Sequence, residues 1–79
     1  MSREDALALI QVALTSVCPD YDGQITEKTE LVEEDIIDSL DSMNLLFEIE
    51  EKLGKKLTSI DEDYNDFGVG ALIDIITAA

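Results

Sequence analysis

One short stretch combines residue types and spacing that could do chemistry, namely Asp38–Met43, with the sequence Asp-Ser-Leu-Asp-Ser-Met. Asp38 is a favourable N-cap, because its carboxylate can accept hydrogen bonds from the free backbone N–H groups of a first helical turn. Ser39 then takes the first helical position, with its hydroxyl pointing outward at the positive end of the helix dipole. An anionic group on that hydroxyl would lie beside unpaired N–H donors, so Ser39 is a candidate for covalent modification.

The composition restricts the classes of partner. The chain has 79 residues, with 19 acidic and 5 basic side chains and a net charge of −14. This length predicts a single domain, residues 1–79, with a small core. A hydrophobic content of 46% argues against disorder. The negative charge repels nucleic acid and anionic membrane surfaces and favours proteins that carry basic patches.

Several kinds of catalytic and metal site are excluded by the residues present. The chain contains no histidine, which excludes Ser-His catalysis and histidine-based metal sites. The lysines lie at the other end of the helix that begins at Ser39, so this serine has no nearby base and a hydrolase is not expected. Asp61-x-Asp63-x-Asn65 begins like a calcium loop, but Asp66 stands where glycine is required. We therefore predict neither an enzyme nor a metal site.

The expected location is cytoplasmic. Cys18 is the single cysteine, so no internal disulfide can form, and we expect a small hydrophobic role for it. No leading segment combines basic residues with an apolar run, as a signal peptide does. No apolar stretch approaches the roughly 20 residues that cross a bilayer, so no membrane association is predicted.

The first helix is expected from about Arg3 to Val17. Ser2 can cap it and Pro19 disfavours its continuation. Apolar residues at helical spacing form its inward face, which comprises Leu7, Ile10, Leu14 and Val17. Leu9 and Val12 lie outside that face, and we expect them to pack against the following loop.

A long connection, residues 20–37, follows the first helix. Connections of this length in a small domain are usually functional or partly structured. Its apolar residues could attach it to the helices, and they are Ile25, Leu31, Val32 and Ile36. A short helical turn is expected near residues 33–36.

The second helix is expected from about Ser39 to Leu53. Its core-facing residues fall within an arc of about 100°, and they are Leu45, Leu46, Ile49 and Leu53. Leu40 and Phe47 lie on the far side among acidic residues, an arrangement typical of a surface that binds partner proteins. The alternative is that the loop or the third helix covers them.

The remaining chain completes an all-α prediction, a small four-helix bundle with a long first loop. Gly54 should end the second helix, and lysines 52, 55 and 56 complement its negative end. A short third helix is expected over about Asp61 to Asn65, capped by Thr58 or Ser59, and a last helix over about Val69 to Thr77. Gly68 and Gly70 are expected to give a flexible entry to that last helix, with Tyr64 and Phe67 closing one end of the core.

Asp38–Met43, followed by Leu45-Leu46, Ile49-Glu50-Glu51 and Leu53-Gly54, resembles the acyl carrier proteins. The resemblance extends over essentially the whole chain in length, acidity and helix order. It implies that Ser39 carries a 4′-phosphopantetheine arm, attached from coenzyme A by a phosphopantetheinyl transferase. It implies a monomer that carries acyl groups as thioesters to partner enzymes with basic docking patches, in a fatty-acid, polyketide or specialised lipid pathway. The residues implied at the attachment site are Asp38, Ser39, Leu40 and Asp41, and those at the docking face are Leu40, Asp41, Met43, Asn44, Phe47, Glu48 and Glu51.

The chain also departs from the pattern of housekeeping fatty-acid carriers. Ile36-Ile37 precede the motif where small residues are usual. Asn44 stands where an acid is common, and Glu48 stands where a small apolar residue is usual. A specialised carrier is therefore favoured. Two alternatives remain, an aminoacyl or peptidyl carrier and an unmodified acidic helical adaptor that binds a basic partner protein.

Overall fold

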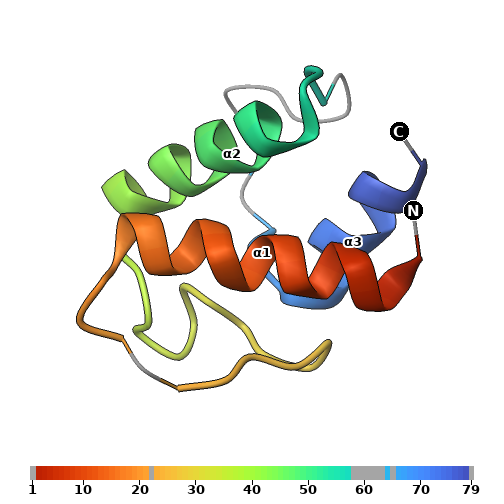
Figure 1. The fold of residues 1–79 in the computed structure, drawn as a ribbon. Coiled ribbons are helices and arrows are strands. Elements are labelled where there is room, and N and C mark those ends of the chain that lie inside the picture. Colours follow the sequence, from red (N-terminus) through yellow and green to blue (C-terminus); the bar gives the residue numbers. More distant parts are fainter. Residues whose placement is uncertain (1, 22, 58–63, 65, 79) are drawn as a thin grey trace.

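Three helices pack together in the computed structural model (Figure 1), which describes residues 2–21, 23–57, 64 and 66–78. They are α1 (Arg3–Val17), α2 (Ser39–Leu53) and α3 (Val69–Ala78). α1 packs against both α2 and α3, and the connection from α1 to α2 runs on the side of α1 away from α2 (Figure 1). The expected all-α class is confirmed for the described residues. The short helix predicted over about Asp61 to Asn65, with its caps Thr58 and Ser59, lies outside the described residues except for Tyr64.

The helix boundaries follow from local capping chemistry. The Ser2 hydroxyl accepts a hydrogen bond from the Asp5 backbone N–H at 3.1 Å, which begins α1 as predicted. Gly54 ends α2 with a left-handed conformation, φ 74°, which glycine adopts without steric cost. The predicted bounds of α1 and α2 are confirmed, and α3 extends one residue beyond the predicted end at Thr77.

The core lies between the inward faces of the three helices and the connecting loop. Its fully buried large side chains are Ile10, Leu14, Leu31, Leu45, Ile49, Val69, Leu72 and Ile73. Leu46 is also buried, whereas Leu7, Val17 and Leu53 are partly buried against the same cluster. The inward faces predicted from helical spacing are thus confirmed.

Val12 was wrongly predicted to pack against the loop. Its side chain is 54% exposed, whereas Leu9 is partly buried against the core. The loop is instead attached through Gln11, whose Oε1 accepts from the Ile25 N–H at 3.0 Å and whose Nε2 donates to the Gly23 carbonyl at 3.4 Å. A polar anchor satisfies buried backbone groups that an apolar contact would leave unpaired, so the loop follows Gln11 rather than Val12.

The loop is bound to the start of α3 by backbone pairing. Its apolar anchors are confirmed, since Ile25 and Leu31 are buried and Val32 and Ile36 pack partly against the core. The Leu31 N–H donates to the Phe67 carbonyl at 3.1 Å, and the Val69 N–H donates to the Thr29 carbonyl at 2.8 Å. These bonds surround a bridge between residues 30 and 68, and a small patch of strand-like pairing thereby joins loop and helix.

Aromatic residues close one end of the core, as predicted. Phe67 is buried, and its ring meets that of Tyr64 edge to face, with centroids 5.6 Å apart and planes at 81°. The Tyr64 hydroxyl is buried with no hydrogen-bond partner among the residues described. Burial of this group, and secondarily the charge of Asp66, raises the pKa of Tyr64 to about 12.

Arg3 joins three segments that are distant in sequence. Its guanidinium donates to Glu27 Oε1, with Nε at 3.0 Å, and to Asp74 Oδ1, with Nη1 at 2.6 Å. The hydrogen bond to Glu27, and then that to Asp74, raises the pKa of Arg3 above its ordinary value. α1, the loop and α3 therefore meet at one exposed cluster of charges, and because the cluster is exposed it contributes modestly to stability.

Gly68 and Gly70 allow the loop to lie close to the start of α3, and their expected role as a flexible entry to that helix stays a prediction. A Cβ on Gly70 would lie 2.9 Å from the backbone carbonyl oxygen of Glu27. A Cβ on Gly68 would lie 2.7 Å from the side-chain oxygen Oε2 of Glu30. The loop backbone thus rests directly on the first turn of α3, at a distance that only glycine permits at position 70.

Gly70→Ala should therefore destabilise the protein, by about 1 to 2 kcal/mol, because the added methyl group displaces the loop backbone. Gly68→Ala is the matched control and should cost less, since the Glu30 side chain can rotate away. Urea denaturation followed by far-ultraviolet circular dichroism measures both. Equal costs for the two variants would show that contact with the loop backbone does not distinguish these glycines.

Candidate functional site

Ser39 is exposed at the first position of α2, as predicted from the sequence. Asp38 precedes it with extended backbone, and its Oδ1 accepts a hydrogen bond from the Asp41 N–H at 2.8 Å. The Asp38 carbonyl accepts from the Ser42 N–H at 3.0 Å, which closes the first turn. The first N–H groups of a helix have no intrahelical acceptor, so the Ser39 hydroxyl projects into water beside partial positive charge.

Ser42, the second serine of the motif, has a different environment. Its side chain is only 3% exposed, and its Oγ donates to the Ser39 carbonyl at 2.7 Å. That hydroxyl is therefore inaccessible and already bonded, whereas Ser39 is exposed. The sequence analysis did not single out Ser42. Its burial could have been predicted, because Ser42 lies one turn after the cap on the same face as Leu45 and Leu46.

A compact turn delivers the chain to Asp38. The Leu31 carbonyl accepts hydrogen bonds from the N–H groups of Ile36, at 2.9 Å, and Ile37, at 3.1 Å. Asp35 closes this turn with φ 59°, a left-handed conformation that Asp tolerates better than most residues. Ile37 is buried while Asp38 and Ser39 are exposed. The buried anchor therefore fixes the point at which the chain emerges as α2.

An apolar strip runs along the outer face of α2, and we call Leu40, Met43 and Phe47 the α2 strip. Leu40 and Phe47 are each 73% exposed and Met43 is 46% exposed. The alternative that the loop covers Leu40 and Phe47 is therefore wrong, and the third helix that was the other candidate cover lies outside the described residues except for Tyr64. Residues spaced by three and four lie on one face of a helix, so the strip presents a continuous apolar line to solvent.

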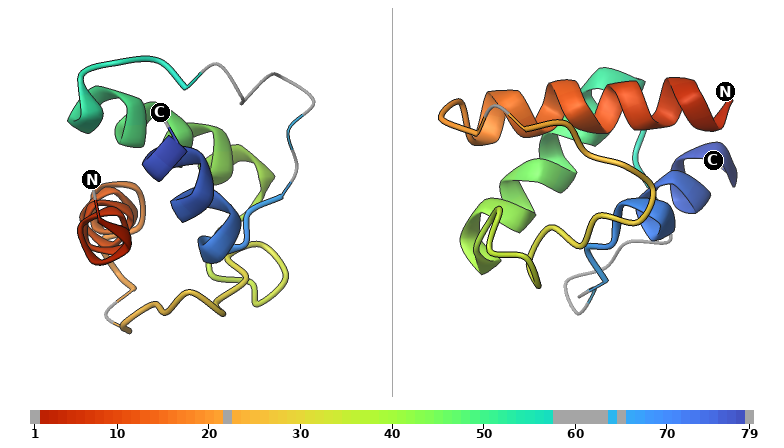
Figure 2. Two further views of the ribbon diagram at one scale, coloured as in Figure 1. Left: turned by 90° about the vertical axis from the view of Figure 1, so that its right-hand side faces the viewer. Right: turned by 90° about the horizontal axis from the view of Figure 1, so that it is seen from below.

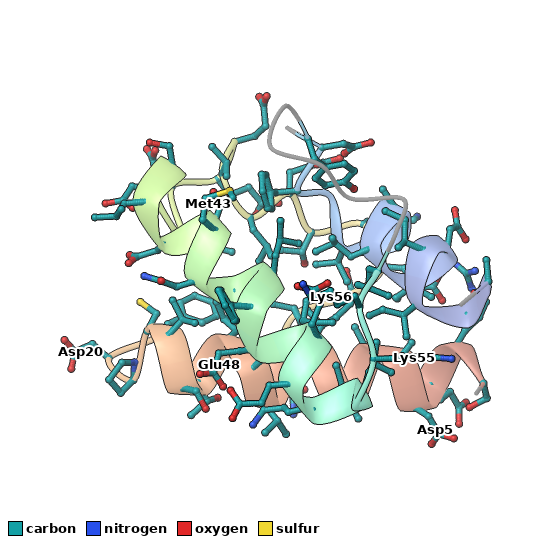
Figure 3. The ribbon with its side chains drawn as sticks, turned by 90° about the horizontal axis from the view of Figure 1, so that it is seen from above. Asp5, Asp20, Met43, Glu48, Lys55 and Lys56 are labelled. Atoms are coloured by element: carbon teal, nitrogen blue, oxygen red, sulfur yellow. The ribbon has the colours of Figure 1, made fainter. Side chains whose placement is uncertain are left out.

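Polar residues border the α2 strip. Asn44 and Glu51 are exposed, while Asp41 and Glu48 are partly buried. Figure 3 shows Met43 and Glu48 on opposite sides of α2, with Glu48 on the side of α1. Glu48 lies 3.8 Å from Lys52 Nζ, an i, i+4 pair that orients its carboxylate along the helix. Five of the seven residues predicted at the docking face are exposed, whereas Asp41 and Glu48 are partly buried, and Glu48 lies at the edge towards α1.

A shallow depression of about 340 Å³ lies beside the strip at the C-terminal end of α2. Its lining residues are Phe47, Glu50, Glu51, Gly54, Lys55 and Lys56. The Glu50 carboxylate is engaged, because its Oε2 accepts from the Leu57 N–H at 2.8 Å, which holds the chain after α2 against the helix. From the sequence we interpreted Lys55 and Lys56 only as charges that complement the helix dipole, so this depression was not predicted.

Asp38→Ala should destabilise the protein by about 1 kcal/mol, because the bond to the Asp41 N–H is lost and the turn that presents Ser39 frays. Asp38→Asn is the matched control, since asparagine removes the charge and keeps a capping oxygen. Thermal and urea unfolding, followed by circular dichroism, compare the two variants with the wild type. If asparagine costs as much as alanine, the carboxylate charge rather than the cap stabilises this turn.

Metal sites and membrane-spanning helices are two further features that the described residues could contain. Among the described residues, no group of three or more aspartate, glutamate, cysteine or histidine side chains is placed to hold a metal ion. The three helices, as far as the structure describes them, also include none that is long and apolar enough to cross a membrane.

Comparisons with known proteins do not assign a family or a function to this site. No protein-family model matches the chain, no curated protein does, and no solved structure does.

Proposed function

We propose that this chain is an acyl carrier protein that holds acyl groups on a 4′-phosphopantetheine arm at Ser39 and delivers them to partner enzymes. One observation carries the proposal. An exposed serine at the first position of a capped amphipathic helix lies directly beside an exposed apolar strip, in a protein with net charge −14. The first feature suits covalent attachment of a phosphate group, and the other two suit brief docking to basic partners.

The residues around Ser39 fit such a group. The hydroxyl is exposed, and the adjoining N–H groups of α2 favour an anion. Asp38 holds the turn through the Asp41 N–H, so its role is to position Ser39. Because the link would be covalent, it would not depend on a binding pocket. When attached, the group supplies a terminal thiol on a long flexible arm, which gives several enzymes access to one cargo at high local concentration.

The docking face would consist of the α2 strip and its polar border. Leu40, Met43 and Phe47 supply apolar contact, while Asp41 and Glu51 supply charge for basic partners. Such interfaces should be small and transient, since a carrier must leave each enzyme. The departures at Ile36, Ile37, Asn44 and Glu48 favour a specialised pathway. The same geometry would serve an aminoacyl or peptidyl carrier.

A second candidate function, an unmodified acidic adaptor, is favoured by the exposure of the strip alone. Leu40 and Phe47 are each 73% exposed, which would suit stable recruitment of one partner as well as transient docking. The adaptor requires no covalent change at Ser39, so modification separates the two functions.

The test is the intact mass of the purified protein before and after incubation with coenzyme A and a broad-specificity phosphopantetheinyl transferase. A carrier gains one phosphopantetheinyl group on each chain. Far-ultraviolet circular dichroism on the same sample establishes that the helices are formed. A folded chain that keeps its original mass would support the adaptor and overturn the carrier.

A further inference from the structure

The outer face of α2 is electrically polarised along its length. At its N-terminal end Asp38 is exposed and Asp41 half-buried, after a turn that carries further acids. At its C-terminal end Lys55 and Lys56 are exposed beside the depression. The α2 strip lies between these ends. Glu50 and Glu51 line the same depression, so this end carries both signs of charge, whereas the N-terminal end carries acids alone.

The lysines at this end differ in what they contact. Lys52 pairs with Glu48 at 3.8 Å. No carboxylate of the described residues forms an ion pair with Lys55 or Lys56. Figure 3 shows Lys56 beside the body of α2 and Lys55 projecting away from it. Lys56 is therefore the cation best placed to meet a group that docks on the strip.

The depression at the C-terminal end of α2 combines a concave surface with the charges of Lys55 and Lys56. Phe47 forms one wall and is also the last member of the α2 strip. Of the two acids in the lining, Glu50 already accepts the Leu57 N–H at 2.8 Å and is held against its own chain, whereas Glu51 is exposed. An apolar side chain could enter beside Phe47 while a neighbouring carboxylate meets Lys56.

We propose that α2 binds a partner helix with a fixed order of side chains: basic residues at Asp38 and Asp41, apolar residues on the α2 strip, and a carboxylate at Lys56. The inference rests on the proposed docking function and adds the direction of docking. Lys56 follows the end of α2, in the segment that the Leu57 N–H holds beside Glu50 Oε2 at 2.8 Å. From Asp41 to Glu50 the helix rises roughly 14 Å. A partner helix of similar length therefore spans both charged ends. A partner with basic residues alone would satisfy only the acidic end.

The experiment is a double-mutant cycle with a designed peptide. The peptide is held helical by a side-chain staple, with arginines at one end, leucines at spacings of three and four in the middle, and glutamates at the other end. A second peptide has glutamines in place of the glutamates. Fluorescence anisotropy gives the dissociation constant of each peptide with the wild type and with Lys56→Gln. Lys28→Gln is the matched control, because Lys28 is an exposed lysine in the connection between α1 and α2 and does not line the depression.

Replacing the peptide glutamates should weaken binding to the wild type about threefold, the scale of one exposed ion pair. The same replacement should have no weakening effect with Lys56→Gln, and should keep its full effect with Lys28→Gln. Equal effects in all three proteins would overturn the inference, as would failure of the first peptide to bind the wild type. So would a dimer, detected by sedimentation, that Lys56→Gln dissociates, since a second copy would then occupy the face.

Because peptide binding requires no modification of Ser39, its outcome is separate from that of the mass experiment. A chain that is modified but shows no coupling at Lys56 would be a carrier with a different docking direction. A chain that shows the coupling but gains no phosphopantetheinyl group would retain this polarised face and lose the carrier function.

Discussion

Ser39→Ala should gain no phosphopantetheinyl group under conditions in which the wild type is completely modified, whereas Ser42→Ala should be modified like the wild type. The two serines lie in one turn of α2 and differ in access. Ser39 is exposed at the first helical position, while Ser42 is 3% exposed with its Oγ bonded to the Ser39 carbonyl at 2.7 Å. A transferase can reach only the first hydroxyl without unwinding the helix.

Ser42→Ala is a demanding control because it alters the same turn. It removes one hydrogen bond, worth about 1 kcal/mol, and alanine is a better helix former than serine. The variant should therefore remain folded, and intact mass with peptide mapping would place the added group on Ser39. Modification of Ser39→Ala, or loss of modification in a folded Ser42→Ala, would contradict the assignment of the attachment site.

Local chemistry made the site predictable from the sequence. An aspartate followed by a serine and an apolar helical pattern fixes the start of α2, and a single glycine fixes its end. Because these signals act within a few residues, the bounds of α2 and the exposure of Ser39 needed no knowledge of the rest of the chain. The same reasoning placed Leu40 and Phe47 on the outer face, where each is 73% exposed.

Contacts between distant segments were not predictable in this way. Arg3 binds Glu27 and Asp74, which are 24 and 71 residues away in sequence, and no local pattern selects these partners among 19 acids. Gln11 likewise gave no signal that it would attach the loop, and so Val12 was assigned that role wrongly. The hollow beside Phe47 depends on how the chain after Gly54 folds back, which helical spacing does not describe.

The views of Figure 2 show how the long connection reaches α2. After leaving α1 it passes α3 before it turns back to the start of α2. Leu31 links this connection to the rest of the fold. Its side chain is fully buried, its N–H donates to the Phe67 carbonyl at 3.1 Å, and its carbonyl accepts from Ile36 and Ile37. One residue therefore joins the core, the approach to α3 and the turn that ends at Asp38.

Leu31→Ala should destabilise the protein by about 2 to 5 kcal/mol, because it removes a fully buried side chain and leaves a cavity that the surrounding helices cannot fill. A domain of 79 residues has a total stability of roughly 4 to 12 kcal/mol. The variant is therefore expected to lose a large share of its stability. Urea denaturation followed by circular dichroism, with the transition midpoint and slope both fitted, measures the loss.

Leu40→Ala is the matched control, since it makes the same chemical change at a leucine that is 73% exposed. Its effect on stability should be within about 0.5 kcal/mol, because little apolar surface returns to water and alanine favours the helix. In the peptide-binding experiment, Leu40→Ala should weaken binding of the helical peptide while the fold stays intact. Equal stabilities for the two variants would mean that the Leu31 side chain does not anchor the loop, and the placement of Ser39 would then depend on the buried Ile37 and the Asp38 cap.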